Sequence, residues 1–209
     1  MKGLRQKLVS TLRNKGIRDE KVLNAIGTIP RHLFLDAAFS DWAYKDQAFP
    51  IESDQTISQP FTVARQTELL EVKRRDKILE IGTGSGYQSC VLSEMGAKVY
   101  SIERQDKLFY KTNRLLEQIG YSKIRTLLGD GFSGSERFAP FDKILVTCAC
   151  PYIPMNLVGQ LKKGGIMVVP VGDAEETQKM LKIYKKGEQL LIKDFGQYRF
   201  VPMLQGVTS

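Results

Sequence analysis

Apolar side chains recur at helical spacing in the first part of the chain. Leucines every four residues predict an amphipathic helix over Lys2–Asn14, and a second apolar repeat predicts another over Asp19–Thr28. Gly16 stands where a C-terminal helix cap would, and Asp19 is a candidate N-cap. Pro30 should end the second helix, because the residue before a proline disfavours helical geometry.

After Lys77 the pattern changes to β-branched runs that alternate with helix-length amphipathic stretches. The predicted strands are Ile78–Ile81, Val99–Ile102, Ile124–Leu128, Lys143–Thr147 and Ile166–Val171, with helices over Gln88–Met95, Lys107–Ile119 and Asn156–Leu161 between them. Three further strands are predicted near the C-terminus, at Met180–Lys185, Leu190–Asp194 and Tyr198–Leu204, with a hairpin turn near Gly187. The segment 31–60 has no clean period, and we expect it to be irregular.

This alternation of strands and helices predicts an α/β fold. We expect a doubly wound, Rossmann-like parallel sheet with N-terminal helices and a C-terminal β extension. In such sheets a ligand binds at the carboxyl ends of the strands, near the point where the strand order reverses. The pattern leaves open the strand order after the fifth strand.

The composition narrows the class of protein. The chain has 209 residues, of which 42% are hydrophobic and 26% charged, values that are typical of one folded domain. No apolar run approaches the roughly 18 residues of a membrane span, so we expect a cytoplasmic protein without a membrane partner. We also expect a monomer. Three cysteines cannot build a disulfide framework, and one histidine argues against a metal cluster or a hydrolase triad. The net charge of +8 favours acidic partners.

The clearest chemical signal is the stretch Ile78–Tyr87, which reads ILEIGTGSGY. A predicted strand is followed by three alternate glycines and then by a helix. Glycines at these positions permit a tight turn whose backbone N–H groups can approach a nucleotide. The third glycine comes one residue earlier than in the dinucleotide motif, and Glu80 lies two residues before the first. This spacing is typical of class I methyltransferases that use S-adenosylmethionine.

Two more acidic residues follow later strands. Glu103 ends the next strand, about 20 residues on, where a carboxylate can accept both ribose hydroxyls. Asp130 follows the third strand within Gly129–Gly131 and could accept the adenine amino group, with the glycines letting the ring lie flat. Together the three elements predict an adenosine cofactor, although each one alone could be a structural turn.

A family resemblance rests on a longer set of motifs. They are QTISQP at Gln55–Pro60, YSIE at Tyr100–Glu103, GDG at Gly129–Gly131, APFD at Ala139–Asp142, LKKGG at Leu161–Gly165, VPVG at Val169–Gly172 and RFVP at Arg199–Pro202. With the glycine stretch, they make the chain resemble the protein-L-isoaspartate O-methyltransferases over nearly its whole length. The resemblance implies one methyltransferase domain over 1–209, with a helical and substrate-loop segment at 1–60, a cofactor-binding core at 61–172 and C-terminal strands at 173–209.

The resemblance also implies an activity and a set of site residues. The activity would be methyl transfer from S-adenosylmethionine to the α-carboxylate of L-isoaspartyl residues in damaged proteins and peptides, which begins repair through a succinimide and leaves S-adenosylhomocysteine. By match to the family's motifs, Ser58 would be the active-site hydroxyl, and Thr56 and Ile57 would line the peptide cleft. The cofactor would be held by Gly82, Thr83, Gly84, Glu103, Asp130 and Gly131, with no metal.

The chemistry explains why the chain needs no strong base. A carboxylate with an ordinary pKa of about 4 is already an anionic nucleophile at neutral pH. Orientation is then the main contribution, and Ser58 can supply it by hydrogen bonding one carboxylate oxygen. The other interpretation of Ser58 is a serine that caps a helix starting after Pro60.

Several positions depart from the family pattern or have simpler explanations. Glu52 and Asp54 replace usual glycines, which adds negative charge near a site for carboxylates, and Cys148 and Cys150 replace usual alanines. We interpret these cysteines as buried packing residues, with a redox-sensitive pair as the alternative. The basic run Lys73–Arg75 is interpreted as a solvated helix end, and His32 and Trp42 as packing residues.

Two other functions remain open. A nucleic-acid methyltransferase would use the same cofactor motifs and the positive charge, although the Asp/Asn-Pro-Pro-Tyr and Pro-Cys signatures of such enzymes are missing, so we do not expect a nucleic-acid partner. A catalytically silent domain that retains the cofactor fold is the third possibility.

Overall fold

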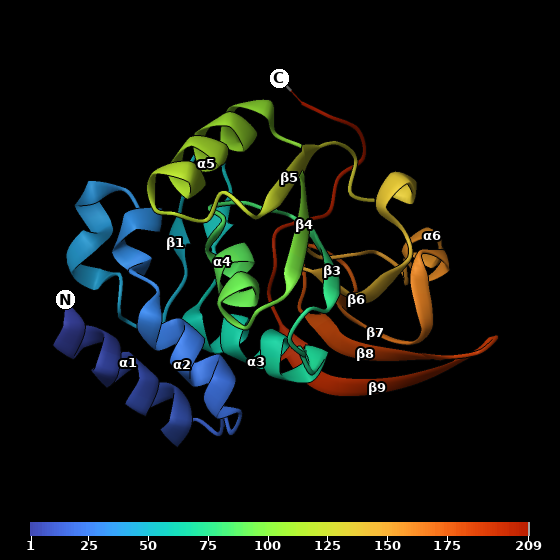
Figure 1. Ribbon diagram of the computed structural model, residues 1–209, viewed down its shortest axis with the longest axis horizontal. Helices are drawn as coiled ribbons and strands as arrows, with labels where there is room; N and C mark the ends of the chain where they lie inside the picture. Colours follow the sequence, from blue (N-terminus) through green and yellow to red (C-terminus); the bar gives the residue numbers. More distant parts are fainter. Residues whose placement is uncertain (209) are drawn as a thin grey trace.

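The computed structural model, which describes residues 1–208, begins with two packed helices. Helix α1 (Lys2–Asn14) and helix α2 (Glu20–Thr28) agree with the predicted spans, and they lie side by side at one end of the molecule (Figure 1). The Asp19 side chain accepts a hydrogen bond from the Lys21 N–H at 2.8 Å, so the predicted N-cap is confirmed. Gly16, with a φ of +100°, turns the chain between the helices.

A seven-stranded sheet forms the centre of the molecule. Its strands are β3 (Lys77–Ile81), β4 (Lys98–Glu103), β5 (Arg125–Leu128), β6 (Phe141–Val146), β7 (Leu161–Val171), β8 (Gln178–Lys186) and β9 (Gln189–Tyr198). They lie in the order β5-β4-β3-β6-β7-β8-β9. The five from β3 to β7 are parallel, whereas β8 and β9 form an antiparallel hairpin that turns at Gly187, as predicted. The order reverses between β3 and β6, so the glycine stretch lies at the switch point.

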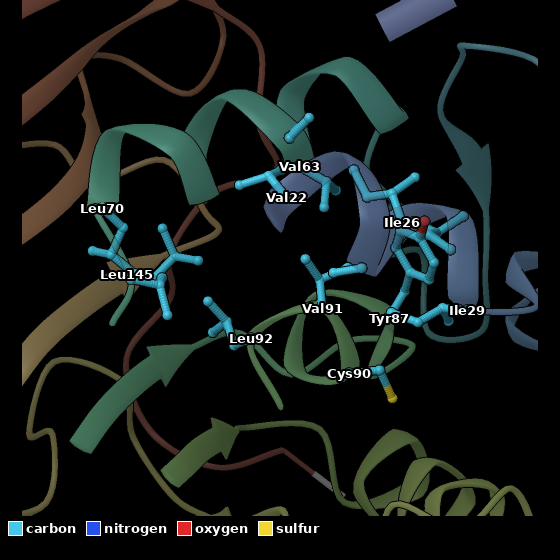
Figure 2. Close-up of a cluster of buried hydrophobic side chains, with 14 of the residues drawn as sticks. Val22, Ile26, Ile29, Val63, Leu70, Tyr87, Cys90, Val91, Leu92 and Leu145 are labelled. Carbon is cyan, nitrogen blue, oxygen red and sulfur yellow. The ribbon is translucent and has the colours of Figure 1, made fainter. Parts of the chain in front are cut away.

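Helices cover both faces of this sheet. Helix α3 (Pro60–Leu70), helix α4 (Tyr87–Glu94) and helix α5 (Asp106–Gln118) pack on one face, and α6 (Met155–Gly159) packs on the other. Two hydrophobic cores result: the first lies between the sheet and α3, α4 and α5, and the second lies between the sheet and α6. Because side chains alternate along a strand, Ile78 joins the first core and Leu79 joins the second. Figure 2 shows the first core, where α2, α3 and α4 meet. Each fully buried leucine or isoleucine there contributes about 1.5–3 kcal/mol to folding.

Residues 31–59 contain only short elements, as the missing period predicts. They are η1 (Arg31–Phe34), η2 (Ala37–Trp42), β1 (Phe49–Pro50) and β2 (Thr56–Ile57), and a similar short turn, η3 (Glu136–Phe138), follows β5. His32 packs as expected, because its Nδ1 lies 2.7 Å from the hydroxyl of Tyr44. The interpretation of Trp42 as a packing residue is wrong. Its side chain is 48% exposed, with the Lys45 ammonium 4.9 Å from its ring centroid.

Two predictions about the second half of the chain are wrong. The helix predicted over Asn156–Leu161 ends at Gly159, and Leu161 instead begins β7, since its buried side chain joins the second core. The strand predicted over Tyr198–Leu204 does not form. Tyr198 ends β9, and the chain then crosses the carboxyl ends of the strands as an extended tail held by isolated bridges. Within residues 1–208, no helix combines the length and apolar character needed to cross a membrane.

Candidate active site

The glycine turn after β3 is shaped by a hydroxyl from the end of β6. Gly82 adopts a φ of +93°, which side-chain-bearing residues rarely take. The Thr147 hydroxyl donates to the carbonyls of Ile81 and Gly82, at 2.9 and 2.8 Å. A Cβ on Gly82 would lie 2.7 Å from this hydroxyl oxygen. The first glycine is therefore required by both backbone geometry and space.

Glu103 is held beside this turn by three backbone groups. One carboxylate oxygen accepts from the Gly84 N–H at 2.8 Å, and the other accepts from Arg104 and Gln105 at 2.8 and 2.9 Å. The residue is only 4% exposed. Because β3 and β4 are neighbouring parallel strands, the glycine turn and this carboxylate meet at the same edge of the sheet, as the sequence predicts.

Glu80 lies under the turn rather than in the pocket. Its side chain is fully buried, and one carboxyl oxygen accepts from Ser89 and from Ser101, the latter at 2.8 Å. The Ser101 hydroxyl is also 2.7 Å from that of Thr83. Burial raises the pKa of Glu80 to about 7, although the two serine hydrogen bonds oppose this. The side chain thus links β3, β4 and the turn as a group that is partly neutral at pH 7.

We expect this buried acid to make stability fall as the pH rises. The folded protein retains the Glu80 proton between the ordinary pKa of 4.5 and about 7, whereas the unfolded chain loses it. The stabilising contribution is complete below pH 4.5 and lost as the pH passes 7, which amounts to about 3 kcal/mol. Urea denaturation of the cofactor-free protein and of Glu80→Gln measures this, since the variant lacks the decline. Exposed Glu117→Gln is the control, and parallel curves for wild type and Glu80→Gln would contradict the prediction.

A pocket opens at the carboxyl ends of β3, β4 and β6 and brings most of the predicted site residues together. Those that line it are Thr56, Ile57, Ser58, Gly82, Thr83, Gly84, Glu103 and Gly131. Asp130 is placed beside the pocket rather than in its lining. Its carboxylate accepts from the N–H groups of Phe132 at 2.8 Å and Gly206 at 2.9 Å. A carboxylate can accept about four hydrogen bonds, so its role toward adenine stays a prediction.

The segment 47–59, here called the Ser58 loop, forms one wall of the pocket. Its ends pair as β1 and β2, with Phe49 opposite the buried Ile57. Ser58 does not cap α3. The N-cap residue is Gln59, and the first turn of the helix is held by Asp46, whose carboxylate accepts from the Phe61 N–H at 2.7 Å. Among residues 1–208, no hydrogen bond occupies the Ser58 hydroxyl, and the helix-cap interpretation is therefore wrong.

Several pocket residues were not predicted from the sequence. They are Gln55, Val63, Gln66, Ile81, Ser85, Tyr87, Gln88, Ile102, Arg104, Gln105, Thr147, Cys148, Met203 and Leu204. Val201 and Pro202 also line the pocket, and the sequence indicates Phe200–Pro202 as a second, weaker candidate for peptide contact. Ser85 and Tyr87 belong to the glycine stretch, so proximity to the motif could have indicated them. The tail lines the pocket because backbone bonds join Ala149 to Val201 and Met203, both at 2.8 Å. Local sequence carries no signal for such long-range pairing.

The two acidic departures in the Ser58 loop differ in their surroundings. Glu52 pairs with Lys111 of α5 at 3.0 Å, and both side chains are largely exposed, so this charge is locally balanced. Asp54 has no ion-pair partner among the described residues, and it adopts a φ of +54°, as does Ser53 at +61°. Both residues therefore hold left-handed conformations that a glycine would adopt more easily.

Replacing Asp54 with glycine is expected to change kinetics more than stability. The free energy of unfolding should change by less than about 0.5 kcal/mol. Glycine removes the strain of a left-handed backbone conformation, but it also raises the conformational entropy of the unfolded chain, and the two effects oppose each other. The KM for an acidic substrate peptide should fall about two- to threefold at low salt and approach the wild-type value at 0.2 M salt, where exposed charges are screened. Glu188→Gln, at the hairpin tip, is the control. A salt-independent KM for both proteins would argue against the charge effect.

All three cysteines are buried and free. Cys148 lines the pocket, and the Cys150 sulfur lies 3.2 Å from that of Met203 in the tail. Burial raises the pKa of Cys148 well above its ordinary value and that of Cys150 to about 12. Thiols that stay protonated at neutral pH are poor nucleophiles, which favours the packing interpretation over a redox-sensitive pair.

The pocket residues fit an adenosine cofactor whose amino-acid end carries an ammonium group. Gly131 keeps space open, because a Cβ there would lie 2.5 Å from a methyl group of Ile81 and 3.0 Å from that of Met203. Ile102 and Met203 offer apolar surface for a base, and Glu103 offers a carboxylate for a diol. The Gln88 amide oxygen is buried without a partner in residues 1–208, so an acceptor is available for a cationic group.

Comparisons with known proteins agree with this geometry. The family model described as "Protein-L-isoaspartate(D-aspartate) O-methyltransferase (PCMT)" matches residues 3–208. A protein-L-isoaspartate O-methyltransferase of Christiangramia forsetii is 54% identical over 97% of this chain and 95% of its own length.

Solved structures show the same fold. A protein-L-isoaspartate O-methyltransferase superposes with a TM-score of 0.86 and 29% identity, over 95% of this chain and 65% of that longer chain. A methyltransferase from Plasmodium falciparum, solved with S-adenosyl-L-homocysteine, superposes with a TM-score of 0.83 and 21% identity over 96% and 98% of the two chains. The fold is thus that of class I S-adenosylmethionine-dependent methyltransferases. From its fold, its motifs and the match over nearly its full length, the chain belongs to the protein-L-isoaspartate(D-aspartate) O-methyltransferase family.

Proposed function

We propose that this chain transfers the methyl group of S-adenosylmethionine to the α-carboxylate of L-isoaspartyl residues in damaged proteins and peptides. The methyl ester then closes to a succinimide without further catalysis, and hydrolysis of the succinimide restores part of the normal aspartyl linkage. The observation that carries the proposal is that Ser58 lines the same pocket as the glycine turn and Glu103. Family membership supports the same substrate class.

The protein groups can bring the two reactants into line. When bound, S-adenosylmethionine supplies an electrophilic methyl group on a cationic sulfur. The glycine turn and Glu103 would hold its adenosine part, and the Ser58 hydroxyl would donate to one oxygen of the substrate carboxylate, which aims the other oxygen into the pocket. Alignment of this kind can lower a barrier by about 7–11 kcal/mol, so no general base is required.

A larger groove beside the pocket fits the rest of an extended peptide. It has a volume of about 1040 Å³ and shares Thr56, Ser58 and Pro202 with the pocket. Its far wall is formed by β9 and the start of the tail, including Phe195 and Arg199. Isoaspartyl sites occur in varied sequences, so recognition through backbone pairing with such an edge suits the task. We propose that Thr56 contacts the peptide on the opposite wall of the groove and that Ile57 contacts it from the wall of the pocket.

The basic run and the positive charge do not favour the nucleic-acid alternative. Lys73–Arg75 is exposed, as expected, but it lies in the turn between α3 and β3 rather than at a helix end. Two of its residues line a hollow with other cations at the amino ends of the strands. The cationic residues around that hollow are Arg74, Arg75, Lys98, Lys123 and Arg125. The candidate active site lies at the carboxyl ends of the same strands, about 17–20 Å away for strands of this length. These cations therefore lie away from the pocket, and they give no support to a nucleic-acid base bound in it.

One assay tests the proposed function. Labelled methyl transfer is measured with an isoaspartyl peptide, with its normal aspartyl counterpart, and with DNA and RNA. Strong preference for the isoaspartyl peptide is the expected result. Absence of methyl transfer to both peptides would contradict the proposed function, and methylation of DNA or RNA would favour a nucleic-acid methyltransferase. Cofactor binding without any transfer would indicate a silent binding domain.

We further propose how the protein exists in the cell. The chain would act as a cytoplasmic monomer in which 1–60 supplies the helical support and the substrate loop, 61–172 the cofactor core and 173–209 the C-terminal strands. Three buried thiols without disulfide bonds suit a reducing compartment.

A further inference from the structure

Arg31 is a fully buried guanidinium whose hydrogen bonds reach both ends of the Ser58 loop. Its side chain has 0% exposure. One terminal nitrogen donates to the carbonyl of Gln47 at 3.2 Å and to that of Ser58 at 3.3 Å. The other two nitrogens, Nε and Nη1, are buried with no partner in residues 1–208. A single side chain therefore joins the start of the loop to the residue proposed for catalysis.

The charge of Arg31 is not balanced by a nearby carboxylate. No acidic group among residues 1–208 forms an ion pair with it, and Asp46, the acid with the clearest influence on it, is bound to Lys15 at 2.6 Å. Burial lowers the pKa of Arg31 only to about 10, so the guanidinium stays charged at neutral pH. A buried cation without a counter-ion costs several kcal/mol in general, and such sites call for an explanation beyond packing.

Arg31 also lies against the wall of the pocket. Its guanidinium carbon is 5.2 Å from the ring centroid of Tyr87, and Tyr87 lines the pocket at the start of α4. Figure 2 shows Tyr87 extending from α4 toward α2, beside Ile26 and Ile29. The cation thus contacts two residues that line the pocket, Tyr87 through its ring and Ser58 through its backbone carbonyl. In surroundings of low polarity its field is weakly screened, and it favours negative charge in the pocket.

We propose that Arg31 is a positioning residue that fixes the Ser58 loop over the pocket and makes the site prefer an anionic substrate to a neutral one. This inference rests on the proposed function, because it assigns the source of the preference for a carboxylate. It differs from the role of Ser58, since Arg31 acts through the loop backbone and through its field. Neither effect requires contact with the substrate.

Three substitutions separate the two effects. Arg31→Lys retains the charge with fewer donors, Arg31→Gln retains a donor without the charge, and Arg31→Met removes both. For each variant we would measure kcat and KM with an isoaspartyl peptide, and the Kd of S-adenosylhomocysteine by calorimetry. We would also measure the affinity ratio between that peptide and its neutral amide analogue. Arg13→Met is the matched control, because it removes an exposed cation of α1 that pairs with Glu20.

The expected pattern distinguishes positioning from a purely structural role. In Arg31→Met, kcat/KM falls about 30-fold while the Kd of S-adenosylhomocysteine changes less than about twofold. The carboxylate-to-amide affinity ratio shrinks about tenfold in Arg31→Gln and Arg31→Met but is retained in Arg31→Lys. If Arg31→Met does not fold, the carboxylate-to-amide affinity ratios of Arg31→Gln and Arg31→Lys still show whether the charge sets the preference.

Three outcomes would overturn the inference. They are wild-type kinetics in all three variants, an equal loss of cofactor and peptide affinity, and a ratio that shrinks as much with lysine as with glutamine. Failure of the wild-type protein to methylate the isoaspartyl peptide is a separate result that counts against the proposed function. The affinity ratio, which needs no turnover, would still test the role of Arg31.

Discussion

Replacing Ser58 with alanine is expected to lower kcat/KM for an isoaspartyl peptide about 100-fold, the scale of effect seen when a reacting group is misplaced by about 1 Å. Ser58 lines both the pocket and the groove, and loss of its hydroxyl removes the donor that would orient the substrate carboxylate. The Kd of S-adenosylhomocysteine should change less than about twofold, since the glycine turn and Glu103 are untouched. Steady-state kinetics and calorimetry provide the two readouts.

A control from the same loop makes the Ser58 result specific. Ser53→Ala removes a hydroxyl that lies outside the pocket lining, so its kinetics should match those of the wild type. Equal losses of turnover and of cofactor affinity in Ser58→Ala would show that the serine is structural. Wild-type turnover in Ser58→Ala would remove Ser58 from the proposed mechanism altogether.

Replacing Glu103 with glutamine is expected to weaken S-adenosylhomocysteine binding about 10- to 100-fold. The carboxylate accepts three backbone N–H bonds, and hydrogen bonds to a charged acceptor contribute about 1.5–3 kcal/mol each. Glutamine keeps the volume of the side chain, but its NH₂ group faces donors instead of accepting from them. The turn at Gly84 should loosen, and the proposed ribose contact should be lost. Calorimetry with S-adenosylhomocysteine measures the effect.

Glu117→Gln, on the exposed surface of α5, is the matched control for Glu103→Gln and should bind the ligand as the wild type does. The thermal stability of the cofactor-free proteins separates a local loss from unfolding. Unchanged affinity in Glu103→Gln would contradict the assignment of this residue to the cofactor. If Tm and ligand affinity both fall, the three backbone hydrogen bonds to Glu103 mainly stabilise the fold.

The elements predicted with fewest errors are those specified by neighbouring residues. Helix α1 agrees with its prediction because apolar spacing and flanking polar residues are local signals. The glycine turn was found because its backbone angles require glycine at Gly82. Leu161 was misassigned because an apolar residue at the end of a short helix also suits the start of a buried strand, and burial against the second core decides between them.

The candidate site could be predicted only in part. Glu103, Gly82 and Ser58 were recognised from motif and family pattern, and they line one pocket. The tail residues Val201–Leu204 were predicted as a strand, and their contact with Ala149 depends on a path across the sheet. Arg31 carried no sequence signal at all, because its burial and its bonds to Gln47 and Ser58 come from long-range packing.

The sequence by itself determined the alternating strand and helix pattern, the cofactor turn and the family. These follow from side-chain periodicity and from positions that only certain residue types can occupy. Tertiary structure alone decided the strand order beyond β7, the route of the tail and the unbalanced charge behind the Ser58 loop. Such features depend on which distant segments share a buried surface. Local preferences do not encode that choice, because the free energy of burial depends on the whole fold.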